Sequence, residues 1–198
     1  MQTPPRKGLA VTDGWSHVRL WLTVGLGVAA DLATKHVGWN LLGGPPESGG
    51  HEVAVIPGWL RLVCSENPGI VFGFNFSEDL GLGEPAARAV TILLTVATSA
   101  LIFYVFAASR RAQRWVHLWC GLILAGAVGN LVDRVVFGHV RDLIQFTVQV
   151  GGKPVWPFVF NLADVYLVLG VVAIAVTMLR APAPGKDPGP RGRSRKES

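Results

Sequence analysis

The feature that most constrains this chain is a long apolar run, residues 89–109, in which no charged side chain occurs. A helix that spans a bilayer needs about 20 mostly apolar residues in succession. A buried helix of a soluble bundle would instead carry polar residues along one face at helical spacing. The run carries no charged face of this kind, so the sequence predicts a membrane-spanning helix.

Three further apolar runs have a similar length. Residues 20–42 are interrupted by Asp31 and Lys35, residues 115–132 have no charge, and residues 157–179 contain only Asp164. The composition agrees, because half of the 198 residues are hydrophobic and only 16% are charged, against about 25% in a typical soluble domain. With two Cys, 13 Pro and 24 Gly, a disulfide scaffold and a collagen are excluded. We therefore predict an all-α membrane protein with four transmembrane helices.

The positive charges predict how the chain is oriented. Most Lys and Arg residues gather in segments 1–19, 110–114 and 180–198, whereas loops 43–85 and 138–157 hold few. The positive-inside rule then places both termini in the cytoplasm and both long loops outside. We expect residues 1–19 to form a cytoplasmic tail, residues 20–179 the membrane domain, and residues 180–198 a disordered basic cytoplasmic tail. The pI of about 9.7 therefore indicates topology and contact with anionic lipid, with no nucleic acid as a partner.

The two outer loops carry strand-like segments. Residues 52–56 and 59–65 are short runs rich in Val, Leu and Trp, separated by Pro57 and Gly58, and residues 146–156 resemble a hairpin that turns at Gly151 and Gly152. We predict a small β platform on the outer membrane face, built from both loops. Cys64 on this platform and Cys120 inside the third span are interpreted as packed thiols.

Ionisable residues occur at the outer ends of the predicted spans. A charge at the bilayer centre costs about 2.5–3.5 kcal/mol on insertion scales, so such groups usually serve a function. The expected site contains six of them, which should lie in one layer: Asp31, Lys35, Asp133, Arg134, Asp142 and Asp164. For the first four, structural ion pairing and a direct chemical role remain equally open.

Helical spacing suggests which of these groups share a face. Asp31 and Lys35 are four residues apart, with the acid first, as an ion pair prefers. Asn130, Asp133 and Arg134 share a face of the third span, and Gly126 and Gly129 allow a second helix to approach closely. Asn161 and Asp164 stand three residues apart at the outer start of the fourth span.

Asp142 and Asp164 point more strongly to chemistry. Neither has an obvious local cation except Arg141, whose side chain should point away from Asp142 if this segment is extended. Two close carboxyls cannot both ionise cheaply, so one can remain protonated while the other activates a water. Which of the two holds the proton stays open. HExxH and GxSxG motifs are absent, which argues against a zinc protease and a serine hydrolase.

Two other classes of protein could use the same acids. A non-enzymatic membrane carrier would spread them through the bilayer depth instead of gathering them at one side. A metal-dependent lipid-phosphate enzyme could use Asp133 and Asp142 as magnesium ligands, but it would need more phosphate-binding cations than Arg134 and Arg141.

Four motifs in order resemble the lipoprotein signal peptidase (signal peptidase II) family. They are DLATK, ENPGIVFGF, GNLVDRVVFGHVRDLIQF and FNLADVYLVLG, and the resemblance extends over residues 20–179. It implies a membrane aspartic endopeptidase of the bacterial inner membrane. Such an enzyme removes the signal peptides of prolipoproteins by cleaving just before a diacylglyceryl-modified cysteine.

The resemblance also implies roles for individual residues. Asp142 and Asp164 correspond to the catalytic pair. Substrate-binding or site-ordering roles are implied for Asn67, Gly69, Asn130, Arg134 and Asn161, and structural support for Asp31, Lys35 and Asp133. No metal or cofactor is expected. The expected partners are diacylglyceryl prolipoproteins and membrane lipid, and the expected state is a monomer.

Overall fold

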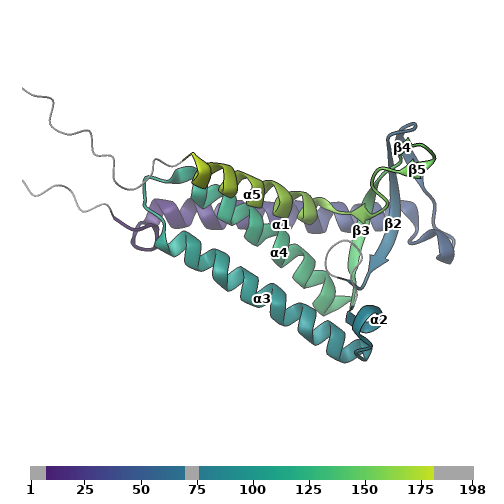
Figure 1. Cartoon of the computed structure of the whole chain (residues 1–198), viewed down its shortest axis with the longest axis horizontal. Coiled ribbons are helices and arrows are strands. Elements are labelled where there is room, and N and C mark those ends of the chain that lie inside the picture. The colour runs from purple at the N-terminus through teal and green to yellow at the C-terminus, as the bar shows by residue number, and fades with distance from the viewer. Residues whose placement is uncertain (1–7, 70–75, 181–198) are drawn as a thin grey trace, which may run out of the picture.

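The computed structural model describes residues 8–69 and 76–180. In this part of the chain, four long helices run side by side along the molecule, and a small antiparallel sheet lies across one end of them (Figure 1). The long helices are α1 (Gly14–Leu42), α3 (Glu84–Ala108), α4 (Arg114–Val136) and α5 (Leu162–Leu179). Three short helices also occur: η1 (Ala10–Thr12), η2 (Pro46–Ser48) and α2 (Phe76–Leu80). The remainder of the predicted tails, residues 1–7 and 181–198, lies outside the described residues, as do residues 70–75 of the first loop.

Local sequence signals set the ends of the helices. The Asp13 carboxylate caps α1 by accepting the backbone N–H of Ser16 at 2.9 Å, and α1 ends at Gly43, whose φ of 75° suits glycine. Asn161 caps α5 in a reciprocal capping box with Asp164. The first turn of α5 is therefore fixed by the same two polar residues that the spacing singled out.

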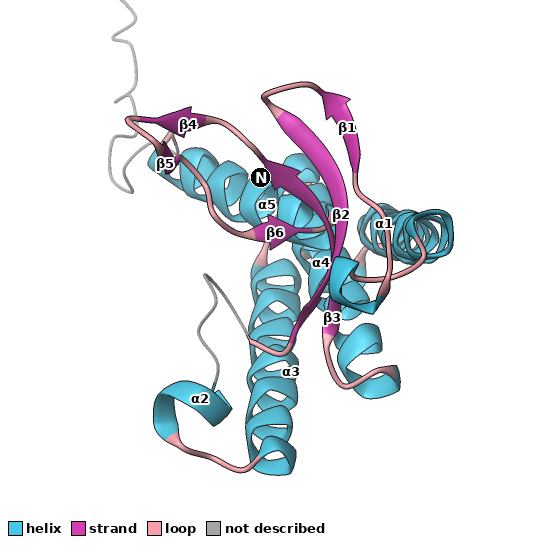
Figure 2. Cartoon of the chain, turned by 90° about the vertical axis from the view of Figure 1, so that its right-hand side faces the viewer, coloured by secondary structure: helices cyan, strands magenta, loops and turns pink. Residues whose placement is uncertain are grey.

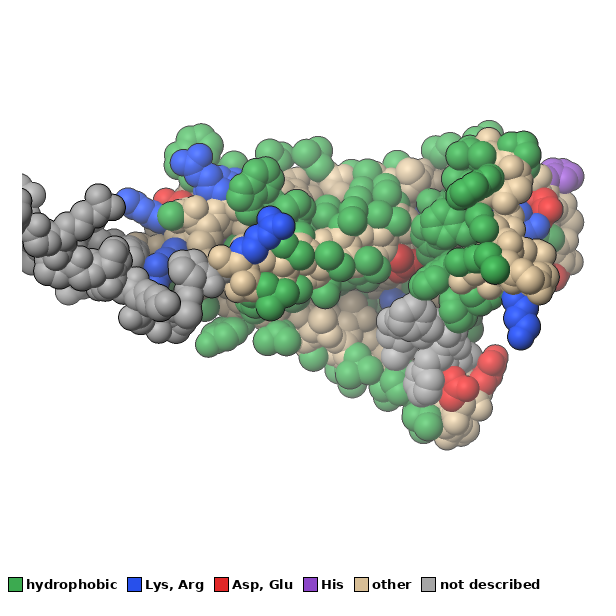
Figure 3. Space-filling model, turned by 45° about the horizontal axis from the view of Figure 1, so that its top comes forward, with side chains coloured by type: hydrophobic (Ala, Val, Ile, Leu, Met, Phe, Trp, Pro, Cys, Tyr) green, Lys and Arg blue, Asp and Glu red, His purple; other side chains and the backbone are tan. Residues whose placement is uncertain are grey.

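Three of the helices, α3, α4 and α5, are long and apolar enough to cross a membrane. The first predicted span, α1, has sufficient length but is not among them, and Asp31 and Lys35 lie within it. Most of α4 is buried between its neighbours, whereas α3 and α5 turn most of their surface outward. Hydrophobic side chains occupy much of the visible face of this helical region (Figure 3), as expected of helices in contact with lipid.

The sheet joins the two loops that the sequence predicted to meet. Its order is β1 (Val53–Ile56), β2 (Leu60–Asn67), β3 (Val140–Phe146) and β6 (Val159–Phe160), and all its pairings are antiparallel. Viewed from this end, the strands cross over the ends of the helices (Figure 2). A separate hairpin of β4 (Gln149–Val150) and β5 (Lys153–Pro154) turns at Gly151 and Gly152, as predicted. A small sheet built from both loops is therefore confirmed.

Several details differ from the sequence prediction. Helix α1 begins at Gly14, within the segment expected to be the N-terminal tail. Helix α2 lies in the first loop, where five residues are too few to give a periodic signal. Helix α5 begins at Leu162 instead of residue 157, because Val159–Phe160 pair with β3 and Asn161 then caps the helix. Cys64 and Cys120 are both free and buried, which confirms that they are packed thiols.

Candidate active site

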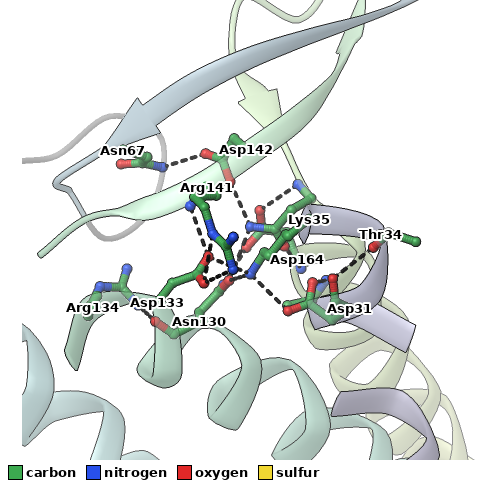
Figure 4. Close-up of polar contacts among 12 residues, drawn as sticks. Asp31, Thr34, Lys35, Asn67, Asn130, Asp133, Arg134, Arg141, Asp142 and Asp164 are labelled. Atoms are coloured by element: carbon green, nitrogen blue, oxygen red, sulfur yellow. Dashed lines mark hydrogen bonds and ion pairs between the residues drawn. The ribbon is translucent and has the colours of Figure 1, made fainter. Parts of the chain in front are cut away.

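The predicted site residues meet where the sheet crosses the ends of α1, α4 and α5. Asp142 comes from β3 and Asp164 from the first turn of α5, and Figure 4 shows their side chains in one polar cluster. Asn161 joins the two carboxyl groups. Its Nδ2 donates to Asp142 Oδ1 at 2.6 Å, and its backbone N–H donates to Asp164 Oδ2 at 3.1 Å. The two acids are therefore neighbours through a single residue.

Two further asparagines complete the hydrogen bonds to this pair. Asn130 Nδ2 donates to Asp164 Oδ1, and Asn67 Nδ2 donates to Asp142 Oδ2, both at 2.9 Å. Asn67 is itself oriented by the backbone N–H of Gly69, which donates to its Oδ1. Each carboxyl group thus accepts two N–H donors, one on each oxygen.

A fully buried lysine lies beneath the pair. Lys35 Nζ contacts Asp31 Oδ2 at 2.8 Å, Asp133 Oδ2 at 3.2 Å and Asn130 Oδ1 at 2.9 Å. Asp31 also accepts the backbone N–H of Ala163, which ties α1 to the start of α5. The predicted Asp31–Lys35 pair is confirmed, and its lysine also reaches α4.

The other predicted cations have separate partners. Arg141 binds Asp133 through its backbone N–H, Nε and Nη2 at 2.8–3.1 Å. Its side chain is paired with Asp133 rather than with Asp142. Arg134 Nη2 donates to the carbonyl of Gly69 at 2.9 Å. Arg134 therefore positions the segment that carries Asn67.

Glycines let α4 approach its neighbours at this depth. A Cβ on Gly129 would lie 2.4 Å from Asp31 Oδ2, and one on Gly126 would lie 2.4 Å from the carbonyl oxygen of Ala163. A side chain at Gly126 would push the backbone of α5 outward, and one at Gly129 would displace the Asp31 carboxylate. The predicted close approach at both glycines is confirmed.

Comparison with known proteins assigns the family. The model of the family described as signal peptidase (SPase) II matches residues 23–180. The chain belongs to the signal peptidase II family. It is therefore a signal peptidase, a hydrolase of peptide bonds, and the resemblance in its motifs is confirmed.

Curated relatives of this signal peptidase carry the name lipoprotein signal peptidase. The protein of Chlorobaculum tepidum is 37% identical over 65% of this chain and 76% of its own length. That of Rhodopseudomonas palustris is 34% identical over 82% of this chain and 93% of its own length. A solved structure titled as a bacterial membrane enzyme has a TM-score of 0.67 at 23% identity, covering 90% of this chain and all of the other. At that identity the likeness shows a shared fold.

The environment of Asp142 distinguishes it from an ordinary surface acid. Burial, and after it the adjacent carboxylate of Asp164, raises the pKa of the Asp142 carboxyl from 3.8 to about 7. Such a group can carry a proton at neutral pH. The signal peptidase thus has a protonatable carboxyl beside a second one, which is the arrangement that acid–base hydrolysis of an amide needs.

The contacts also bear on a metal-dependent chemistry. Among the described residues, no group of three or more His, Cys, Asp or Glu side chains could hold a metal ion. Asp133 accepts from Lys35 and Arg141 on both oxygens, and Asp142 accepts two asparagine amides. Each oxygen of these two carboxyls therefore accepts at least one donor from the protein.

Sequence reasoning missed most of the contacts that join the site, and two of them show why. It did not assign Arg141 to Asp133, nor the backbone N–H of Ala163 to Asp31. The alternation of β3 was a usable signal for Arg141, since it directs this side chain to the face opposite Asp142. The Ala163 contact had no signal, because it joins segments far apart in the chain.

Proposed function

We propose that this signal peptidase removes the signal peptides of bacterial prolipoproteins by cleaving just before the diacylglyceryl-modified cysteine. Asp142 and Asp164 serve as its catalytic pair. The observation that carries the proposal is the bridge through Asn161, which holds two carboxyl groups together where the sheet meets the helices. The raised pKa of Asp142 supports it, as do relatives that bear the name lipoprotein signal peptidase.

The reaction follows from one neutral and one charged carboxyl. The charged group takes a proton from water as the water oxygen adds to the scissile carbonyl carbon, and the neutral group gives its proton to the carbonyl oxygen. The first group then passes its proton to the nitrogen as the C–N bond breaks. The second regains a proton from one hydroxyl of the intermediate. Both acids return to their starting states.

The neighbouring residues have supporting roles in this scheme. Asn67, Asn130 and Asn161 orient the two carboxyl groups by donating to them. Gly69 and Arg134 hold the segment that carries Asn67. Asp31, Lys35 and Asp133 form the support beneath.

The proposed membrane placement has α1 as the fourth span. Its charged Asp31 and Lys35 are fully buried against α4, so they need not face lipid. Several Lys and Arg side chains gather at the end of the helices opposite the sheet (Figure 3). This favours a cytoplasmic position for both termini and an outer position for the sheet and the site. The proposed state is a monomer.

The substrate then binds with its acyl chains between the helices, in contact with membrane lipid, and its peptide along the sheet. Buried acyl groups contribute about 0.8 kcal/mol per CH₂, so lipidated precursor should be cleaved far better than the same precursor without lipid. EDTA should leave the rate unchanged. Equal cleavage of both precursors would refute the proposed substrate, and loss of cleavage in EDTA would refute a metal-free mechanism.

A further inference from the structure

The buried Lys35 uses one of its three N–H donors to contact a residue of the proposed site. Its Nζ already pairs with Asp31 and Asp133, yet it also donates to Asn130 Oδ1 at 2.9 Å. Asn130 in turn donates from Nδ2 to Asp164. A single amide thus connects a fully buried ammonium group to one member of the proposed catalytic pair.

The orientation of the Asn130 side-chain amide is fixed by neighbouring groups that can only donate hydrogen bonds. The backbone N–H of Asp164 donates to Asn161 Oδ1 at 3.0 Å, so the Nδ2 of Asn161 must face Asn130 and Asp142. An ammonium group has no acceptor. The Oδ1 of Asn130 therefore accepts hydrogen bonds from Lys35 and Asn161, and its Nδ2 donates to Asp164. If this amide were flipped, its Nδ2 would face the N–H donors of Lys35 and Asn161.

This orientation gives Asp164 and Asp142 different electrostatic surroundings. Asp164 accepts an amide polarised by the ammonium group, and it lies in the first turn of the 18-residue helix α5, where the helix dipole favours negative charge. Asp142 is almost completely buried, and its two donors are neutral amides. The charge of Lys35 also acts on Asp142, but burial and the charge of Asp164 act on it more strongly in the opposite sense.

We propose that Lys35 is a positioning residue of the catalytic pair: by fixing Asn130, it keeps the negative charge on Asp164 and the shared proton on Asp142. This inference rests on the proposed function, and it assigns a separate proton-transfer role to each acid of the catalytic pair. Asp164 takes the water proton, and Asp142 protonates the carbonyl oxygen. The other charged groups around Lys35 and the pair are Asp31, Asp133, Arg134 and Arg141. Because Asp133 remains bound to Arg141 without Lys35, removing the lysine with Asp31 leaves no buried charge uncompensated.

The test compares Asp31→Asn with the double variant Asp31→Asn/Lys35→Met. The single variant keeps the bond from Lys35 to Asn130, and the double variant loses it while removing one charge of each sign. The assay is single-turnover cleavage of a diacylglyceryl prolipoprotein peptide as a function of pH, with melting temperature measured in detergent. In the double variant, the acid limb of the rate profile should lie about one pH unit higher than in the single variant. This is the lower end of the pKa change of about 1–3 units that an acid shows on losing a nearby opposite charge. The maximal rate should fall at least tenfold with little change in KM.

An unchanged acid limb in a folded double variant would overturn the inference. A second variant keeps it testable if the double variant fails to fold. Asn130→Asp retains the oxygen facing Lys35 but turns a carboxylate oxygen toward Asp164, so its rate should fall at least a hundredfold. Retention of the rate within threefold would overturn the role given to Asn130. If the parent protein does not cleave the lipidated peptide at all, the proposed function fails, which is a separate outcome.

Discussion

Replacing Gly126 with Ala should separate α5 from α4 and disturb the site at the same time. The new Cβ would lie 2.4 Å from the carbonyl oxygen of Ala163 and 2.8 Å from Leu167 Cγ. The oxygen belongs to the backbone of α5, so relief requires α5 to recede by about 1 Å to reach ordinary contact. Overpacking of this kind costs about 1–3 kcal/mol. Because Asp164 follows Ala163 directly, a misplacement of about 1 Å should also lower the cleavage rate about a hundredfold.

A matched control is available on α1. Gly25 lies within the helix, and a Cβ there would meet nothing within 4 Å, so Gly25→Ala reports the effect of the added methyl group on helix propensity alone, about 1 kcal/mol in favour of Ala. Thermal unfolding in detergent and single-turnover cleavage are measured on both variants. If Gly126→Ala had the same melting temperature as Gly25→Ala and cleaved at the parent rate, the close packing of α4 on α5 would not be what positions Asp164.

Three further predictions concern charge and topology. The folded-state pKa of Asp142, about 7, exceeds the ordinary 3.8, so the folded protein binds more protons and its free energy of unfolding falls as pH rises from about 4 to 7. Asp142→Asn should therefore melt above the parent at about pH 8 and near it at about pH 4; a parallel pH dependence of the two proteins would contradict this. Asp31→Asn, which removes a partner of Lys35, should melt lower yet keep measurable cleavage; complete loss of cleavage in the folded variant would assign Asp31 to the chemistry. Reporters fused at Gly8 or after Ser198 should read cytoplasmic, and an external reading for the C-terminal fusion would exclude four spans.

Much of the fold followed from patterns that are local in the chain. Apolar runs predicted the long helices, and turn residues located both hairpins, because spans and hairpins are specified by consecutive residues. The five-residue helix α2 and the two-residue strand β6 carried no such pattern. Both form beside larger elements, so their existence depends on tertiary contacts.

The sequence predicted which residues belong to the site, but not most of the contacts between them. Spacing predicted the Asp31–Lys35 pair and placed Asn161 and Asp164 together at the start of the fourth span, since each pair lies within about one helical turn. The bond between Lys35 and Asn130 joins residues 95 positions apart. It depends on how closely α1 approaches α4, which no spacing within either helix specifies. The same limit applies to the different roles inferred for Asp142 and Asp164, because these depend on hydrogen bonds between several segments of the chain.

The most direct test of the account is single-turnover cleavage of a diacylglyceryl prolipoprotein by the parent, Asp142→Asn and Asp164→Asn, each at the same concentration of folded protein. Asn keeps the size of Asp but cannot take a proton from water at neutral pH or share one with its neighbour. The account predicts that each substitution nearly abolishes cleavage while the protein remains inserted and folded. If either variant cleaved within about tenfold of the parent, a difference of about 1.4 kcal/mol in the barrier, that residue would not be a catalytic acid.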